Sequence, residues 1–115
     1  MKVMMLILES PEDFDSRSGP AAEAYWGKWR AYSGAVNDKV VGGNILSGGS
    51  QATTLRRRNG ERMVQDGPYA DSKEALGGYM IFEVASMDEA LELASSCPAA
   101  ETGAVELRPI IEMQA

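Results

Sequence analysis

The stretch LGGYMIFEV, residues 76–84, followed by SMDE, residues 86–89, decides the fold, because together they predict a buried strand and the start of a helix. Gly77-Gly78 open an apolar run, which is typical of a core strand. The second stretch is a capping box, in which the Ser86 hydroxyl accepts from the Glu89 amide and the Glu89 side chain reaches back. We therefore expect a strand over 76–84 and then a helix to about residue 96. Its inward residues are predicted to be Ala90, Leu91, Ala94 and Cys97.

Further elements are predicted on both sides of this unit. Apolar residues recur at three- and four-residue steps from about Pro20 to about Val41, which predicts a long helix. Gly42-Gly43 is expected to end it, since glycine adopts the left-handed cap conformation without a Cβ clash. The remaining predictions are a central strand over 2–9, a loop over 10–20, a short strand over 44–47 and a last strand over 104–111.

Asn59-Gly60 predicts a β-hairpin between residues 53 and 66, because a type I′ turn needs positive φ at both central positions. In the register that this turn sets, Arg57 faces Arg62 on the same side of the hairpin. Two arginines directly opposite each other are unfavourable. Either an anionic group from a partner subunit or a ligand lies between them, or the two side chains splay apart into solvent.

The order of elements is β-α-β-hairpin-β-α-β within a single domain, residues 1–115. This order predicts an α+β fold with one largely antiparallel sheet and both helices on one face. Strand segments 3–8 and 79–82 are apolar on both sides, which is typical of strands that are covered on both faces. We therefore predict a homodimer in which two copies pack sheet against sheet about a two-fold axis.

The composition narrows the classes of function. The chain has 115 residues, with 11 Lys and Arg against 17 Asp and Glu, and a net charge of −6 argues against nucleic acid or an anionic membrane as a partner. It has no histidine, which excludes histidine-based acid–base catalysis and every His-containing metal site. No metal-ligand cluster and no phosphate-binding loop is visible, so we expect no metal and no cofactor. The apolar run over 3–8 is too short to span a bilayer, and the single cysteine, Cys97, fits a reducing compartment, so a cytoplasmic location is predicted.

Several motifs occur together in the order that one family shows. The segment DGPYADSKEALGGY, residues 66–79, resembles the signature D-G-P-F-A-E-T-K-E-x-L-G-G-F/Y of the DGPF-type members of the YCII-related (YciI-like) family. The resemblance covers residues 1–112. The stretches that are similar to further motifs of the family are TTLR (53–56), MDEALELA (87–94), CPAA (97–100) and GAVELRP (103–109).

The resemblance implies a ferredoxin-like βαββαβ fold with an inserted β-hairpin, of the dimeric α/β-barrel group, and a ligand cleft beside the sheet near the dimer interface. The biochemical function of the family is largely unassigned. Related members have been proposed to use a His–Asp pair in that cleft. The position of that histidine falls on Tyr32, eleven residues before Gly43, so a histidine-dependent mechanism does not carry over to this chain.

Asp66 and Tyr32 are the candidate catalytic residues. A carboxylate at a Gly-Pro turn either serves as a general base, if it is partly buried, or bonds the backbone amides of an Asx-type turn. Tyr32 either presents its phenol to the cleft as a hydrogen-bond donor or packs in the core. The remaining predictions are a ligand cleft formed by Trp29, Tyr69, Lys73, Tyr79 and Arg57, and a backbone shape set by Gly67, Pro68, Gly77 and Gly78.

Two classes of function stay open. The first is non-catalytic binding, or an unknown activity, with a small molecule (an anionic one is among the candidates) in a cleft near the dimer interface. The alternative is a small-molecule enzyme of isomerase or lyase type that transfers protons through Asp66 without histidine. A carboxylate of Asp66 that lies in a pocket beside a hydrogen-bond donor would favour the enzyme.

Overall fold

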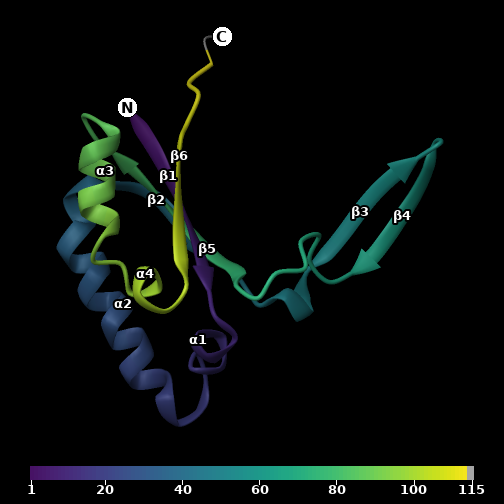
Figure 1. Ribbon diagram of the computed structural model, residues 1–115, viewed down its shortest axis with the longest axis horizontal. Helices are drawn as coiled ribbons and strands as arrows, with labels where there is room; N and C mark the ends of the chain where they lie inside the picture. The colour runs from purple at the N-terminus through teal and green to yellow at the C-terminus, as the bar shows by residue number, and fades with distance from the viewer. Residues whose placement is uncertain (114–115) are drawn as a thin grey trace.

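Residues 1–113, which the computed structural model describes, form a four-stranded sheet with helices on one face and a separate two-stranded hairpin (Figure 1). The last two residues of the predicted domain 1–115 lie outside this described part. The strands are β1 (Lys2–Glu9), β2 (Val40–Ile45), β3 (Thr53–Arg58), β4 (Glu61–Asp66), β5 (Ala75–Glu83) and β6 (Ala104–Pro109). The helices are α1 (Pro11–Asp15), α2 (Ala22–Val36), α3 (Met87–Ala94) and α4 (Pro98–Thr102), and the 3-10 turns are η1 (Gly19–Ala21), η2 (Asn37–Lys39) and η3 (Gly49–Gln51).

The sheet has the strand order β2-β5-β1-β6, and each neighbouring pair is antiparallel. Inward residues of the central strand β1 alternate with outward ones, and Val3, Met5 and Ile7 are buried. They pack with Phe82 of β5 and with buried residues of α2 and α3 to form the core. Helices α2, α3 and α4 lie on this side of the sheet (Figure 1). The other side, which we call the bare face, presents Met4, Leu6, Leu8, Leu76, Tyr79 and Ile81.

The long helix ends earlier than the sequence predicted. α2 stops at Val36, and Val40 already begins β2, so the predicted strand over 44–47 starts four residues too late. Gly43 does not cap a helix but lies inside β2. A Cβ on Gly43 would lie 2.7 Å from the Tyr79 carbonyl oxygen of β5, so glycine allows these two strands to approach closely.

Two short helices were not predicted. The expected loop over 10–20 contains α1, which Ser10 caps by accepting from the Asp13 amide at 3.2 Å. Pro98 begins α4 in the same way that Pro11 begins α1, because proline suits the first turn of a helix. No helix within residues 1–113 is long and apolar enough to cross a lipid bilayer.

The capping box before α3 is confirmed in part. The Ser86 hydroxyl accepts from the Glu89 amide at 3.2 Å, as predicted. The Glu89 side chain does not reach back, and its carboxylate lies 3.6 Å from the Lys39 ammonium instead. Leu91, predicted to point inward, is 53% exposed, and Leu93 packs against the core in its place.

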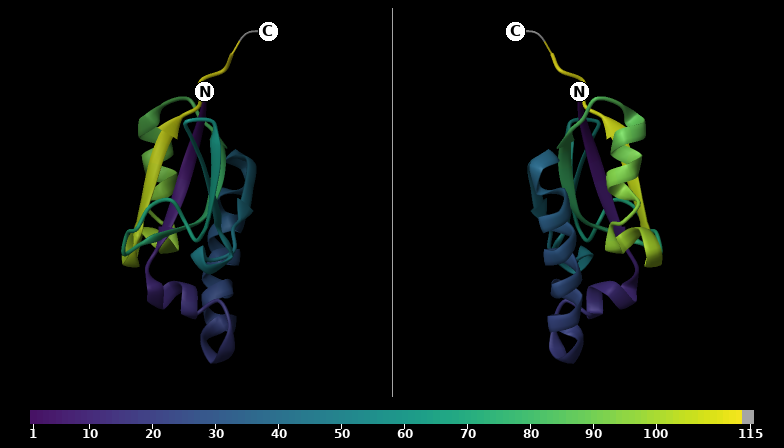
Figure 2. Two further views of the ribbon diagram at one scale, coloured as in Figure 1. Left: turned by 90° about the vertical axis from the view of Figure 1, so that its right-hand side faces the viewer. Right: turned by 90° about the vertical axis from the view of Figure 1, so that its left-hand side faces the viewer.

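The hairpin is confirmed in register and in turn type. Arg57 pairs with Arg62 and Leu55 with Val64, while Asn59 and Gly60 have φ values of 52° and 80°. The hairpin extends away from the sheet on the side of the bare face (Figure 1), and it lies in front of the sheet when that side is viewed directly (Figure 2). The radius of gyration of 16.0 Å therefore exceeds the value of about 13 Å expected for a compact chain of this length.

Candidate functional site

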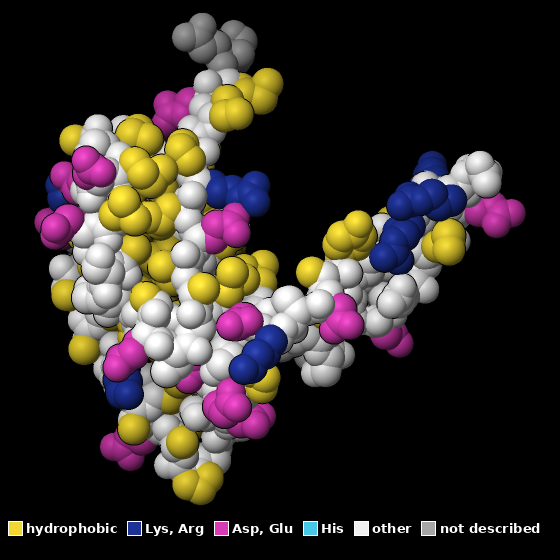
Figure 3. All heavy atoms as spheres, viewed as in Figure 1, with side chains coloured by type: hydrophobic (Ala, Val, Ile, Leu, Met, Phe, Trp, Pro, Cys, Tyr) yellow, Lys and Arg dark blue, Asp and Glu magenta, His cyan; other side chains and the backbone are white. Residues whose placement is uncertain are grey.

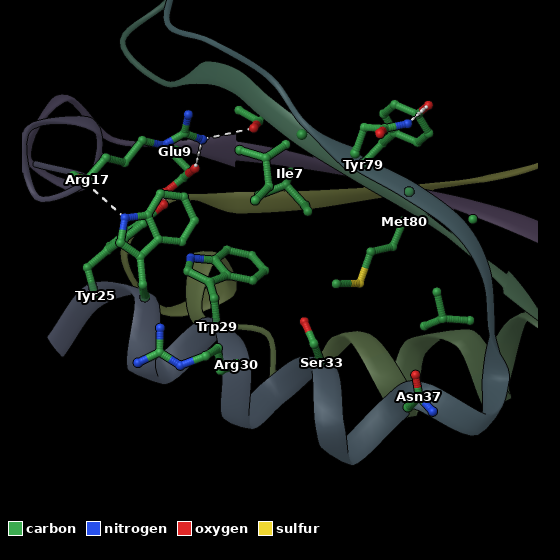
Figure 4. A pocket seen from close by; sticks show the side chains of 18 residues that line it. Ile7, Glu9, Arg17, Tyr25, Trp29, Arg30, Ser33, Asn37, Tyr79 and Met80 are labelled. Carbon is green, nitrogen blue, oxygen red and sulfur yellow. Dashed lines mark hydrogen bonds and ion pairs between the residues drawn. The ribbon is translucent and has the colours of Figure 1, made fainter. Parts of the chain in front are cut away.

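A cavity of about 830 Å³ lies between one face of α2 and the sheet edge formed by β2 and β5 (Figure 4). The opposite wall is largely backbone, because β2 and β5 pass the cavity at Gly42-Gly43 and Gly77-Gly78. The missing side chains leave the space open. The residues that α2 contributes recur about every turn, so they lie on one helix face. They are Tyr25, Trp26, Trp29, Arg30 and Ser33, and Asn37 follows at the C-cap of the helix.

One end of the cavity holds a buried carboxylate (Figure 4). Glu9, the last residue of β1, is only 2% exposed. Its Oε1 atom accepts from Arg17 Nη2 at 2.7 Å, and its Oε2 atom accepts from the Tyr25 hydroxyl. Burying a carboxylate is costly unless it is paired and hydrogen-bonded, and both oxygens of Glu9 have such a partner.

Arg17 connects three parts of the chain at this point. Besides Glu9, its guanidinium donates to the carbonyl oxygens of Leu46 at 2.6 Å and Gly77 at 2.8 Å. A Cβ on Gly77 would lie 2.5 Å from Glu9 Oε1 and 2.6 Å from Arg17 Nη2. Glycine at position 77 therefore makes room for the ion pair, and the Arg17 side chain joins the segment after α1 to strands β2 and β5.

The network fixes the protonation states at this end of the cavity. Burial lowers the pKa of Arg17, but the hydrogen bonds and charges of Glu9 and Tyr25 outweigh it and raise that pKa above its usual value. Burial, together with the hydrogen bond to Glu9, raises the pKa of Tyr25 to about 12. At neutral pH Arg17 is thus charged and Tyr25 protonated, so both act as hydrogen-bond donors rather than as bases.

Stability is expected to fall as Tyr25 loses its proton. The pKa of Tyr25 rises from 10.0 to about 12 on folding. Because the folded-state value is the higher one, this stabilisation is complete below about pH 10 and is lost as the pH rises through about 12. Urea denaturation between about pH 9 and about pH 12 should show a smaller loss for Tyr25→Phe than for the wild type. Equal losses would show that Tyr25 does not carry the effect.

The cavity combines aromatic rings with a positive charge. The rings of Tyr25 and Trp26 meet edge to face at 4.8 Å between centroids, and Trp29 lies beside them along α2. Its charged lining residues are Glu9, Arg17 and the exposed Arg30, so the lining carries a net charge of about +1 in a chain of net charge −6. Within residues 1–113 no three His, Cys, Asp or Glu side chains gather closely enough to hold a metal ion.

Four of the residues predicted from the sequence border this cavity: Trp29, Tyr79, Gly77 and Gly78. Trp29 contributes its ring, whereas the Tyr79 side chain lies on the other side of the strand from α2 (Figure 4). The alternation of β5 explains this, because Tyr79 pairs with Leu6 of the bare face. The Tyr79 hydroxyl accepts from the Asn44 side-chain amide at 2.8 Å.

The two predicted catalytic residues do not come together within one chain. Tyr32 is 4% exposed, and its hydroxyl donates to the Leu93 carbonyl oxygen at 2.7 Å inside the core. Burial raises its pKa further than that of Tyr25. It borders a second hollow of about 630 Å³ between α2 and α4, not the cavity beside β2. Asp66 is exposed at the end of β4, and within residues 1–113 its carboxylate has no hydrogen bond or ion pair.

The other predicted cleft residues lie on or near the hairpin. Tyr69 is 75% exposed, and the Arg56 guanidinium lies 5.2 Å from the centroid of its ring. Lys73 and Arg57 are exposed and do not border the cavity. Gly67, with a φ of 102°, and Pro68 form the turn that leaves β4. The Gly67 amide donates to the Ala52 carbonyl at 2.8 Å, which closes the base of the hairpin.

Glu9, Arg17 and Tyr25 were missed from the sequence, although one signal was present. Glu9 follows Val3, Met5 and Ile7 at steps of two residues, so a strand that continues through position 9 must bury its carboxylate. A buried carboxylate needs a cationic partner. Arg17 is the first basic residue after it in the chain.

Comparison with known sequences identifies one family and one relative. The model of the YCII-related domain matches residues 1–114. An uncharacterised protein of Rhizobium meliloti (strain 1021) is 46% identical over 61 residues, which are 51% of this chain and 49% of that protein. The matched part thus spans about half the length of that relative.

Among solved structures, the fold resembles that of a 5-chloro-2-hydroxyhydroquinone dehydrochlorinase from Burkholderia phenoliruptrix AC1100, solved in complex with 2,5-dihydroxybenzoquinone. The TM-score is 0.57, and the match covers 98% of this chain and 96% of the dehydrochlorinase at 17% identity. An identity this low shows the fold alone. The ferredoxin-like α+β fold expected from the sequence is confirmed, in agreement with the strand order β2-β5-β1-β6.

Proposed function

The chain belongs to the YCII-related family, and from this starting point we propose that it binds a small, flat, anionic organic molecule in the cavity between α2 and the β2–β5 edge. One observation carries the proposal. The rings of Trp26 and Trp29 and the cations of Arg17 and Arg30 border the same cavity. Its volume of about 830 Å³ lies within the usual range of small-molecule sites.

The shape and charge of the ligand follow from the lining. Aromatic side chains favour flat apolar rings, which stack or meet them edge to face. Glu9 already neutralises Arg17 at 2.7 Å, and among the described residues no carboxylate pairs with Arg30. Arg30 is therefore the cation that remains for an anionic group of the ligand. The dehydrochlorinase of the same fold was solved with 2,5-dihydroxybenzoquinone, a flat and acidic molecule, which supports this class.

The second part of the proposal is that two copies of the chain form a homodimer through the bare face. Leu6 and Tyr79 pair on this face, as do Met4 and Ile81, and all four residues are only half-buried in one chain. An apolar sheet face of this kind is normally covered. A second identical face packed about a two-fold axis covers both at once.

Isothermal titration calorimetry with 2-naphthoate and 2-naphthamide tests the ligand class. The two probes share a ring system and differ in charge. We expect the carboxylate to bind about five-fold more tightly to the wild type, since an exposed charge pair contributes up to about 1 kcal/mol. In Arg30→Gln this preference should disappear. Lys28→Gln removes the same charge from the same helix outside the cavity and should keep it.

Two results would contradict the proposed ligand class. Equal affinity of the wild type for both probes would contradict an anionic group on the ligand. Loss of the preference for 2-naphthoate in Lys28→Gln would show that the preference does not depend on Arg30 specifically. 2,5-Dihydroxybenzoquinone serves as an independent probe and should compete with 2-naphthoate for one site.

Catalysis through Asp66 and Tyr32 stays a prediction, and the geometry favours binding over it. Neither residue borders the cavity. The carboxylate in the cavity is Glu9, whose two oxygens already accept from Arg17 and Tyr25. Because both oxygens of Glu9 are occupied by donors, proton transfer to this carboxylate would first require one donor to leave.

A further inference from the structure

The hairpin of β3 and β4, residues 53–66, is called the arm. Its two strands pair only with each other and not with the four-stranded sheet. It projects from the sheet on the side of the bare face (Figures 1 and 2). An isolated two-stranded hairpin is marginally stable in water. A surface on which the arm packs would therefore stabilise it.

The two faces of the arm differ in the partners that their arginine side chains have within the arm. On one face, Arg56 donates to the Gln65 side chain at 3.2 Å and lies over Tyr69, while Arg58 stands opposite Glu61. Arg56 thus has polar and aromatic partners and Arg58 faces a residue of opposite charge, although within residues 1–113 neither arginine forms an ion pair. Met63 is its one large apolar residue, and it is 51% exposed.

On the other face the arginines have no such neighbours, and the one carboxylate of that face, Asp66, lies at the base of the arm beyond the Leu55–Val64 pair. Leu55 and Val64 are directly opposite each other and are 58% and 56% exposed. Next to them Arg57 stands opposite Arg62, and within residues 1–113 neither has an ion pair. Two facing arginines beside an exposed apolar pair are unfavourable in solvent. They suit an acidic surface with an apolar part.

The charge of the chain is divided between the arm and the remainder. Residues 53–66 hold four of the 11 basic residues and two of the 17 acidic ones, so the arm carries +2. Since the whole chain carries −6, the remainder carries −8. Figure 3 shows several basic side chains close together on the arm, whereas acidic ones are spread over the rest of this view. The remainder of a second copy of this chain is therefore opposite in net charge to the arm.

We propose that the arm clasps a second copy of this chain, with Leu55, Arg57, Arg62 and Val64 packed on the acidic surface of that copy. The proposal rests on the homodimer proposed above. A six-residue strand is about 20 Å long, and two sheets packed face to face lie about 10 Å apart. An arm on the side of the bare face is thus long enough to pass the sheet of the second copy and reach its helices.

Sedimentation of the full chain with two matched variants tests this clasp. Leu55→Thr with Arg62→Gln removes one apolar side chain and one charge from the face proposed to dock. Met63→Thr with Arg58→Gln removes the same from the opposite face. We expect the double variant Leu55→Thr/Arg62→Gln to raise the dimer dissociation constant at least about ten-fold. The double variant Met63→Thr/Arg58→Gln should raise it by less than about three-fold. Raising the salt concentration from about 0.05 M to about 0.5 M should weaken the wild-type dimer more than the dimer of Leu55→Thr/Arg62→Gln.

Each outcome has a distinct meaning. Equal effects of the two double variants on the dissociation constant would contradict the clasp but not the dimer through the bare face. A monomeric wild type would overturn both, while calorimetry with 2-naphthoate tests the cavity separately. Hydrogen exchange gives a second measurement that needs no variant. The amides of β3 and β4 should be protected at concentrations where the chain is dimeric and exchange freely on dilution, and equal protection at both would contradict the clasp.

Discussion

Replacing Glu9 by alanine is expected to lower the free energy of unfolding by about 3 to 5 kcal/mol, because it removes one partner of a buried ion pair. The side chain of Glu9 is 2% exposed and that of Arg17 is 15% exposed. Without Glu9, the Arg17 guanidinium and the Tyr25 hydroxyl each lose a strong acceptor in a place that water reaches poorly. Urea denaturation should show a lower midpoint with an unchanged slope, and the melting temperature should fall by at least about 10 °C.

Two further variants make the Glu9 measurement specific. Glu9→Gln keeps an oxygen for Arg17 and removes only the charge, so we expect an intermediate loss of about 1 to 2 kcal/mol. Glu12→Ala removes an exposed carboxylate three residues further on and should change stability by less than about 0.5 kcal/mol. If Glu9→Ala cost no more than Glu12→Ala, the ion pair would not hold this end of the cavity together.

Leu6→Glu is expected to convert the proposed homodimer into monomers. Leu6 lies on the central strand of the bare face, opposite Tyr79 of β5. Sheet-to-sheet packing would bury an unpaired carboxylate at this position in both copies at once. We expect the dissociation constant to rise at least about 100-fold, measured by sedimentation or by light scattering over a dilution series.

Leu91→Glu is the matched control for Leu6→Glu. It places the same charge on an apolar residue that is 53% exposed, on α3 at the opposite side of the sheet. This variant should remain dimeric, and both variants should keep the circular dichroism spectrum of the wild type. A Leu6→Glu protein that dimerises as tightly as Leu91→Glu would place the interface elsewhere.

Local signals in the sequence were enough to predict strand β1 and the hairpin, but not where β2 begins. The alternation in β1 and the turn residues Asn59-Gly60 each have one structural interpretation, and both predictions were confirmed. Gly42-Gly43 has two structural interpretations, because glycine either caps a helix or allows two strands to approach closely. Only the position of β5, more than thirty residues away in the chain, decides between them.

The candidate site was harder to predict, because its residues come from separate parts of the chain. The motif over 66–79 predicted Asp66 as a site residue, but this motif contributes Gly77 and Gly78 to the cavity rather than a carboxylate. The polar network that the cavity does contain, Glu9 with Arg17 and Tyr25, joins the end of β1 to the segment after α1 and to α2. Its geometry depends on how α2 crosses the sheet, which no local pattern specifies.

The two indole N–H signals of an isotope-labelled sample test most directly whether the cavity beside α2 binds the ligand. Both tryptophans of the chain, Trp26 and Trp29, border this cavity, so their nuclear magnetic resonance signals report on it without mutation. Trp29 also borders the hollow between α2 and α4, so the Trp26 signal is the one specific to this cavity. Titration with 2-naphthoate should move both signals along saturating curves, and 2-naphthamide should need higher concentrations to do so. Binding of 2-naphthoate by calorimetry with both indole signals unmoved would place the ligand elsewhere and contradict the proposed function.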